Sequence, residues 1–202
     1  MPARFLKYLI ALLLCASPAS ANPIDQAARL IEEANMERLH VQQTRPGIFI
    51  NAFKTDGCSG GLSDSWRTLA KVWPEWARAI GEIPPWESCC VAHDRDYWRG
   101  EAIDGFDKRL QSDHVLRQCV VLTGQQQGGE IAARLGIPQD DVIEVFNLTA
   151  EMMFHAVRLG GGPCTGLAWR WGHGWPPCHA EPEPGEGQIV QLQGHRNDIP
   201  VD

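Results

Sequence analysis

The stretch of this sequence best suited to chemistry holds two adjacent cysteines, Cys89 and Cys90, followed by His93, Asp94 and Tyr97. On a helix, Cys89, His93 and Tyr97 are four residues apart and share one face. Asp94 lies on a second face, about 100° around the axis. The imidazole can act as a general base, and a carboxylate turned away from it suits a hard cation such as Ca²⁺. Adjacent cysteines point in different directions, so we expect each to bond to a different part of the chain.

A second carboxylate is predicted to face the protein interior. Asp113 lies three residues after Leu110 and three before Leu116, within the apolar stripe of a helix. A carboxylate facing a core is costly unless it is paired or hydrogen-bonded, and His93 is the expected partner. Asp107, on the same helix, is predicted to project toward the polar side. An imidazole held by Asp113 at one nitrogen would keep its other nitrogen available as a base.

The elements that must position these side chains are predicted to be helices, so the expected fold class is mainly α. Ser88 can cap the helix that carries the two cysteines, and Gly100 can end it. Apolar periodicity and prolines predict further helices over 23–43, 63–73, 74–80 and 138–159. Glycines and polar residues over 125–137 predict a loop with one short helix.

The first residues of the sequence predict export, to the periplasm or the medium. Arg4 and Lys7 precede an apolar run over 8–16, and small residues at 19–21 resemble a signal-peptidase site, so 1–21 is interpreted as a signal peptide. Its removal takes Cys15 from the seven cysteines and leaves an even number. An even number of cysteines in an exported chain predicts three disulfides, for which about 15 pairings are possible. The six remaining are Cys58, Cys89, Cys90, Cys119, Cys164 and Cys178.

Length and composition predict one domain and exclude some partners. Of the 202 residues, 22–179 are expected to form the domain, and the Pro-, Gly-, Glu- and Gln-rich stretch over 180–202 a disordered tail. The net charge of −7 makes nucleic acid a poor partner, because binding it depends on cationic side chains.

These motifs resemble the secreted phospholipase A2 family. The pattern Cys-Cys-x-x-His-Asp-x-x-Tyr at 89–97 looks like its active-site helix, and Gly-Cys-Ser-Gly-Gly at 57–61 looks like its calcium loop. Asp113 followed six residues later by Cys119 looks like its second active-site helix. The resemblance covers 55–121. It implies a disulfide-stapled, phospholipase A2-like helical domain with a calcium loop and two packed active-site helices, to which this chain adds a C-terminal helix.

The resemblance also implies an activity and a catalytic set. The expected reaction is Ca²⁺-dependent hydrolysis of the sn-2 ester of glycerophospholipids, at a membrane surface or micelle. His93 would activate the water, Asp113 would orient His93, and Tyr97 would hydrogen-bond Asp113. The oligomeric state is left open.

The metal ligands and the disulfide pairs come from the same resemblance. It implies Ca²⁺ held by the Asp94 carboxylate and by backbone carbonyls of Gly57, Ser59 and Gly61. The implied bridges are Cys58–Cys90 and Cys89–Cys119, which leaves Cys164 for Cys178.

Two alternatives to this enzyme remain. The first is a catalytically weak or inactive toxin-like, lipid-binding or protein-binding module of the same fold, which is favoured by Ser59 where the family loop has glycine. The second is a metal-dependent phosphohydrolase, which would need His114 and His155 close to His93, since transition metals prefer imidazole.

Overall fold

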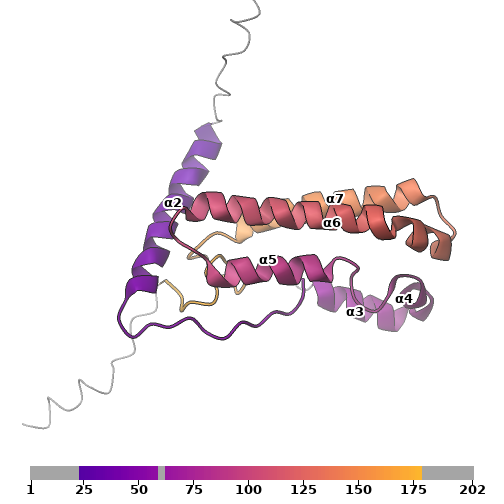
Figure 1. Cartoon of the computed structure of the whole chain (residues 1–202), viewed down its shortest axis with the longest axis horizontal. Coiled ribbons are helices and arrows are strands. Elements are labelled where there is room, and N and C mark those ends of the chain that lie inside the picture. The colour runs from indigo at the N-terminus through magenta and orange to yellow at the C-terminus, as the bar shows by residue number, and fades with distance from the viewer. Residues whose placement is uncertain (1–22, 59–61, 179–202) are drawn as a thin grey trace, which may run out of the picture.

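The computed structural model describes residues 23–58 and 62–178, and within those ranges it is helical with no strand (Figure 1). The expected fold class, mainly α, is therefore confirmed. The predicted signal peptide over 1–21 and the predicted tail over 180–202 lie outside the described residues. The helices are α2 (Pro23–Thr44), α3 (Leu62–Val72), α4 (Pro74–Ile80), α5 (Glu87–Arg99), α6 (Gly105–Leu135) and α7 (Gln139–Gly160).

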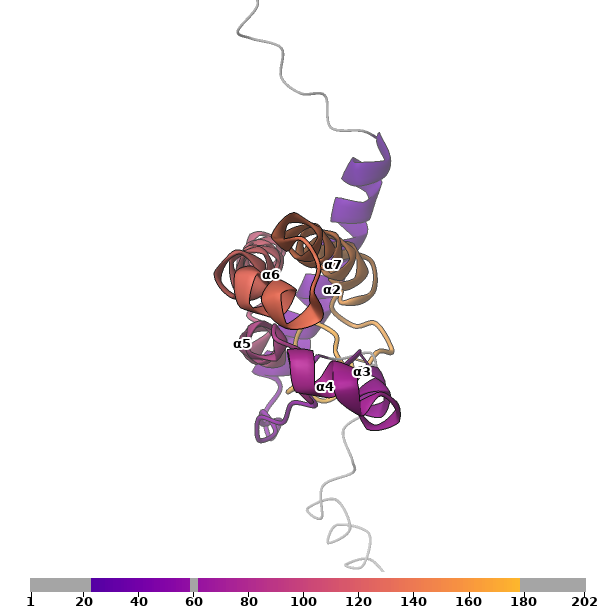
Figure 2. The ribbon, with the colours of Figure 1, turned by 90° about the vertical axis from the view of Figure 1, so that its right-hand side faces the viewer.

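A long helical hairpin forms the frame of the molecule. Helices α6 and α7 run side by side in opposite directions, and α5 lies along α6 (Figures 1 and 2). Helix α2 crosses the hairpin at one end, and α3 and α4 lie at the other end, where α4 also contacts α6 (Figure 1). The segment after α7 returns to α5, where the N–H groups of Gly172 and Gly174 donate to the carbonyls of Tyr97 and Trp98.

Close packing between α6 and α7 corrects one prediction. Residues 125–135 continue α6 instead of forming a loop. At Gly124 an added Cβ would lie 2.5 Å from the Cβ of Phe146, and at Gly128 it would lie 3.3 Å from Ile143. The glycines therefore allow the two helices to approach closely, and their effect on packing outweighs their poor helix propensity.

The ends of α5 follow one sequence signal and depart from another. Gly100 caps the C-terminus with left-handed φ and ψ of 56° and 57°, as predicted. Ser88 is not the N-cap, because the helix begins at Glu87 and Trp86 occupies the cap position without a side-chain cap bond. Trp86 is buried, with its ring 5.2 Å from the ring of Phe146, so core packing decides where this helix starts.

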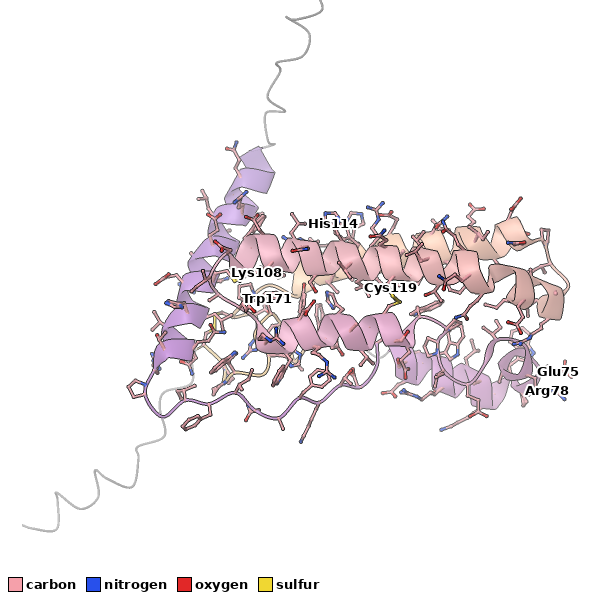
Figure 3. The ribbon with its side chains drawn as sticks, viewed as in Figure 1. Glu75, Arg78, Lys108, His114, Cys119 and Trp171 are labelled. Carbon is pink, nitrogen blue, oxygen red and sulfur yellow. A yellow bond between two sulfur atoms is a disulfide. The ribbon has the colours of Figure 1, made fainter. Side chains whose placement is uncertain are left out.

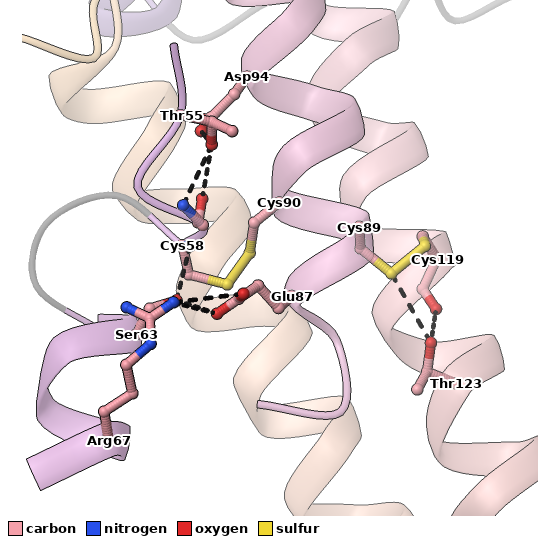
Figure 4. The surroundings of a disulfide bond; sticks show 11 residues. Thr55, Cys58, Ser63, Arg67, Glu87, Cys89, Cys90, Asp94, Cys119 and Thr123 are labelled. Carbon is pink, nitrogen blue, oxygen red and sulfur yellow. Dashed lines mark hydrogen bonds and ion pairs between the residues drawn. A yellow bond between two sulfur atoms is a disulfide. The ribbon is translucent and has the colours of Figure 1, made fainter. Parts of the chain in front are cut away.

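Three disulfides staple these elements, and all three expected pairs are present. Cys58–Cys90 joins the loop before α3 to α5, and Cys89–Cys119 joins α5 to α6 (Figure 4). Cys164–Cys178 closes the segment after α7. Within the described ranges, no helix has the length and apolar character needed to cross a bilayer.

Candidate active site

Helix α5 is anchored on both flanks, and this fixes the direction of its functional side chains. The neighbouring cysteines bond to opposite sides, Cys89 toward α6 and Cys90 toward the loop before α3 (Figure 4). In Figure 3, Cys119 lies on the side of α6 that faces α5. His93, one turn after Cys89, therefore faces α6, whereas Asp94, one turn after Cys90, faces the loop.

His93 and Asp113 form a buried pair, as the apolar stripe around Asp113 predicted. His93 Nε2 lies 2.8 Å from Asp113 Oδ1, and the two side chains are only 5% and 0% exposed. Tyr97 donates its hydroxyl to the same oxygen at 2.7 Å. Because a carboxylate only accepts hydrogen bonds, the network assigns the proton of a neutral His93 to Nε2 and leaves the lone pair on Nδ1.

The second oxygen of Asp113 is bound by an arginine from the C-terminal helix. Arg158, on α7, donates from Nη1 to Asp113 Oδ2 at 2.9 Å and from Nη2 to Glu32 Oε2 at 3.0 Å. Glu32, on α2, also accepts two hydrogen bonds from Arg109, at 2.6 and 2.7 Å. Arg109 in turn donates to the hydroxyl of Tyr97 at 3.0 Å. The pair is thus part of a network that joins α2, α5, α6 and α7.

Two members of this network, Tyr97 and Arg109, have shifted pKa values. Burial, followed by the negative charge of Asp113, raises the pKa of Tyr97 well above its ordinary value, so the phenol stays a donor. Burial by itself would lower the pKa of Arg109, but the hydrogen bonds and the charge of Glu32 outweigh it and raise that pKa. The arginine therefore remains charged despite being 1% exposed.

Asp94 faces the loop that precedes α3, as its place on the second stripe predicted. Thr55 donates its hydroxyl to Asp94 Oδ2 at 2.6 Å and accepts the N–H of Gly57 at 3.1 Å (Figure 4). Burial raises the pKa of the Asp94 carboxyl, in opposition to the hydrogen bond from Thr55. His173, in the segment after α7, lies with Nε2 3.3 Å from the backbone carbonyl oxygen of Asp94.

The donors around Asp94 are oxygen atoms, which suits a hard cation. The Asp94 carboxylate, the Thr55 hydroxyl and the carbonyl of Gly57 all lie on this side of α5. Gly57 has φ of +89°, and a Cβ there would lie 2.7 Å from Ser63 Oγ, so the position requires glycine. Ser59 and Gly61, the other expected ligands, lie outside the described residues. In the described ranges no group of three or more His, Cys, Asp or Glu side chains is arranged to hold a metal.

Two cavities adjoin these groups. One, of about 320 Å³, contains both His93 and Asp94 in its lining, and its remaining wall is largely apolar. The other, of about 360 Å³, is lined by Asp94 together with Lys54, Thr55, Asp56, Ala168, Trp169 and His173. Trp169 lines both cavities, so the two cavities are adjacent. The His93 imidazole is accessible from the first, and the oxygen donors around Asp94 are accessible from the second. The apolar wall of the first cavity consists of Leu116, Met152, Met153, Ala156, Val157 and Trp169.

The histidines needed by the phosphohydrolase alternative lie elsewhere. His114 is exposed on α6, where it stacks on Phe154 with ring centres 4.9 Å apart, and Figure 3 shows it pointing away from α5. His155 packs against the same ring at 5.5 Å. Neither is a hydrogen-bond partner of His93 among the contacts of the described residues.

The sequence reasoning missed three members of the network. Arg109 falls on the same buried stripe as Asp113 and Leu116, at helical spacing, so its position was a usable signal. Glu32 and Arg158 gave no comparable signal, because they are 126 residues apart in the chain and meet only where α2 crosses the end of the α6–α7 hairpin.

The sequence matches no protein-family model, no curated protein and no solved structure at a significant level. We therefore infer the function of this chain from its motif residues and from the geometry of the site.

Proposed function

We propose that this chain is a Ca²⁺-dependent ester hydrolase of the phospholipase A2 type, which cleaves the sn-2 ester of glycerophospholipids at a membrane or micelle surface. The observation that carries the proposal is the His93–Asp113 pair, with 2.8 Å between Nε2 and Oδ1, at the wall of an apolar cavity. An oriented imidazole beside apolar side chains suits an ester whose acyl chain avoids water.

The protein side chains have defined parts in this reaction. His93 Nδ1 accepts a proton from the water that attacks the ester carbonyl, and later returns a proton to the departing glycerol oxygen. Asp113 stabilises the imidazolium that forms in between and keeps the ring from turning. Tyr97 fixes the carboxylate by donating to Oδ1. The wall formed by Leu116 and α7 excludes water from the acyl chain.

The proposed cation site lies next to the dyad, because Asp94 and His93 both line the first cavity. Asp94 would supply its one carboxylate, and Gly57, Ser59 and Gly61 would supply carbonyl oxygens. A bound Ca²⁺ supplies Lewis-acid polarisation of the ester carbonyl. The oxygen donors around Asp94 fit Ca²⁺. Binding of Ca²⁺ to the chain can be measured whether or not the chain hydrolyses lipid.

The experiment is hydrolysis of phosphatidylcholine in mixed micelles by the purified, disulfide-bonded chain, with Ca²⁺ and with excess chelator. We expect release of the sn-2 fatty acid that stops with chelator and in a His93→Gln variant. His114→Gln is the matched control, because it removes an exposed imidazole, and it should keep full activity.

Hydrolysis that persists in chelator would contradict the calcium-dependent mechanism. The alternative of an inactive lipid-binding or protein-binding module predicts a different result: lipid binding with no fatty acid released by the wild-type chain.

A further inference from the structure

The carboxylate of Asp113 is held at both oxygens, although the proposed dyad uses only one. Oδ1 receives His93 and Tyr97, at 2.8 and 2.7 Å. Oδ2 receives Arg158 Nη1 at 2.9 Å. The side chain of Asp113 is 0% exposed and that of Arg158 is 17% exposed, so the contact is largely shielded from water. A carboxylate bound at one oxygen can still rotate about its Cβ–Cγ bond, whereas one bound at both cannot.

Arg158 is itself held by a partner outside the dyad. Its Nη2 donates to Glu32 Oε2 at 3.0 Å, so one guanidinium bridges two carboxylates. Glu32 is fixed by Arg109, which binds both of its oxygens. Arg109 closes the circuit through the hydroxyl of Tyr97. The two carboxylates, Asp113 and Glu32, and the two guanidiniums, Arg109 and Arg158, thus form a largely buried network with no net charge.

The chemistry of arginine makes this contact directional. A guanidinium has five donors in one plane and no acceptor, so it can bind only lone pairs. Arg158, on α7, binds Asp113 Oδ2 at 2.9 Å, so Oδ1 faces α5. The orientation of the carboxylate, and through it the strength of the hydrogen bond from His93 Nε2 to Oδ1, then depends on a residue that does not line the described cavities.

We infer that Arg158 is a positioning residue for the His93–Asp113 pair, and that Glu32 holds it in place from helix α2. The effect on turnover rests on the proposed ester hydrolysis. The effect on the His93 ring does not, because the geometry exists whether or not the chain is an enzyme. Both can be measured on the full, disulfide-bonded chain.

The experiment compares Arg158→Gln, Arg158→Lys and Glu32→Gln with wild type. The matched control is Arg117→Gln, which breaks another Arg–Glu pair between α6 and α7, with Nε 2.7 Å from Glu151, far more exposed and without contact to Asp113. On phosphatidylcholine micelles we expect Arg158→Gln to lower kcat by about 10- to 100-fold, the range for groups that orient a functional ligand. KM should change less than about twofold, since binding of the substrate is untouched.

Conservative replacements separate positioning from general damage. Arg158→Lys should recover part of kcat, because it keeps the charge near Asp113 but cannot bridge both acids. Glu32→Gln should lower kcat less than Arg158→Gln, and Arg117→Gln should leave it unchanged. Equal kcat in Arg158→Gln and Arg117→Gln would overturn the inference.

Ring ¹⁵N chemical shifts of His93, recorded where the ring is neutral, give a readout independent of turnover. Wild type should show the Nε2-protonated form, with an Nε2 shift set by the hydrogen bond to Asp113 Oδ1. Arg158→Gln should keep that form but move the Nε2 shift toward the value of a weaker hydrogen bond; an unchanged Nε2 shift would overturn the inference. If wild type releases no fatty acid, the proposed function fails while these shifts still decide the role of Arg158. If Arg158→Gln does not fold, Glu32→Gln carries the same test, with a moved Nε2 shift supporting the inference and a wild-type shift overturning it.

Discussion

Replacing Asp113 by Asn should abolish turnover, because Arg158 decides which way the new amide faces. Arg158 can only donate, so the amide oxygen must take the place of Oδ2, at 2.9 Å from Nη1. The amide NH₂ group then faces His93 and Tyr97. His93 Nε2 must become an acceptor, which moves its proton to Nδ1, the nitrogen proposed to receive the proton of water.

The magnitude follows from the contacts that change. In other histidine–carboxylate pairs the wrong tautomer lowers kcat by about 10⁴-fold, and we expect a similar loss here. Stability should also fall, because the carboxylate is fully buried beside Arg158 and within 3.8 Å of Arg109. Removing one partner of a buried ion pair costs about 3–5 kcal/mol, and the lower end applies since the amide still accepts from Arg158.

The assay is the initial rate on phosphatidylcholine micelles, with urea unfolding to measure the free energy of unfolding. Asp107→Asn, six residues earlier on the exposed face of the same helix, is the control and should be nearly silent. An Asp113→Asn variant that is folded and fully active would refute the dyad. If Asp107→Asn lost activity while Asp113→Asn kept it, the assignment of the buried face of this helix would be refuted as well.

Four further predictions concern the cation site, one disulfide and the α6–α7 hairpin. Asp94→Asn should weaken Ca²⁺ binding in calorimetry, yet it should stabilise the calcium-free chain at neutral pH. Burial raises the pKa of Asp94, so the charged carboxylate opposes folding above that pKa. The stabilisation by Asn should therefore vanish as the pH falls through the pKa of Asp94. Replacing Cys58 and Cys90 together by Ser should lower the free energy of unfolding by roughly 4 kcal/mol, from a sequence separation of 32. Gly124→Ala should cost about 1–3 kcal/mol, because its Cβ would meet a buried aromatic side chain of α7 at 2.5 Å. Gly129→Ala, which meets only the end of a flexible side chain at 3.4 Å, should instead stabilise by up to about 1 kcal/mol in thermal unfolding.

Local patterns predicted much of the fold and the centre of the candidate site. The i, i+4 spacing on α5 and the apolar neighbours of Asp113 are local facts, and they were sufficient to predict a buried His93–Asp113 contact. Pro74 and Gly100 likewise predicted helix limits, because their backbone preferences act within one or two residues.

The rest depended on packing between distant segments. Taken alone, the glycines over 124–129 indicate a break in the helix. In the structure the absence of a side chain at Gly124 lets α7 pack closely against α6. Ser88 has good capping chemistry, but the burial of Trp86 starts the helix earlier. Arg158 reaches Asp113 only because α7 folds back along α6, which no local pattern specifies.

The adjacent cysteines of α5 make the assembly of this site depend on oxidation. The Cys90 bridge holds the loop of Thr55 near Asp94, and the bridge of the preceding residue, Cys89, holds α5 against the helix of Asp113. In a reducing compartment both links open together, so the oxygen donors and the dyad lose their covalent connections at once. Under the proposed function, the reduced chain is expected to hydrolyse lipid poorly, and recovery of hydrolysis on reoxidation measures that dependence.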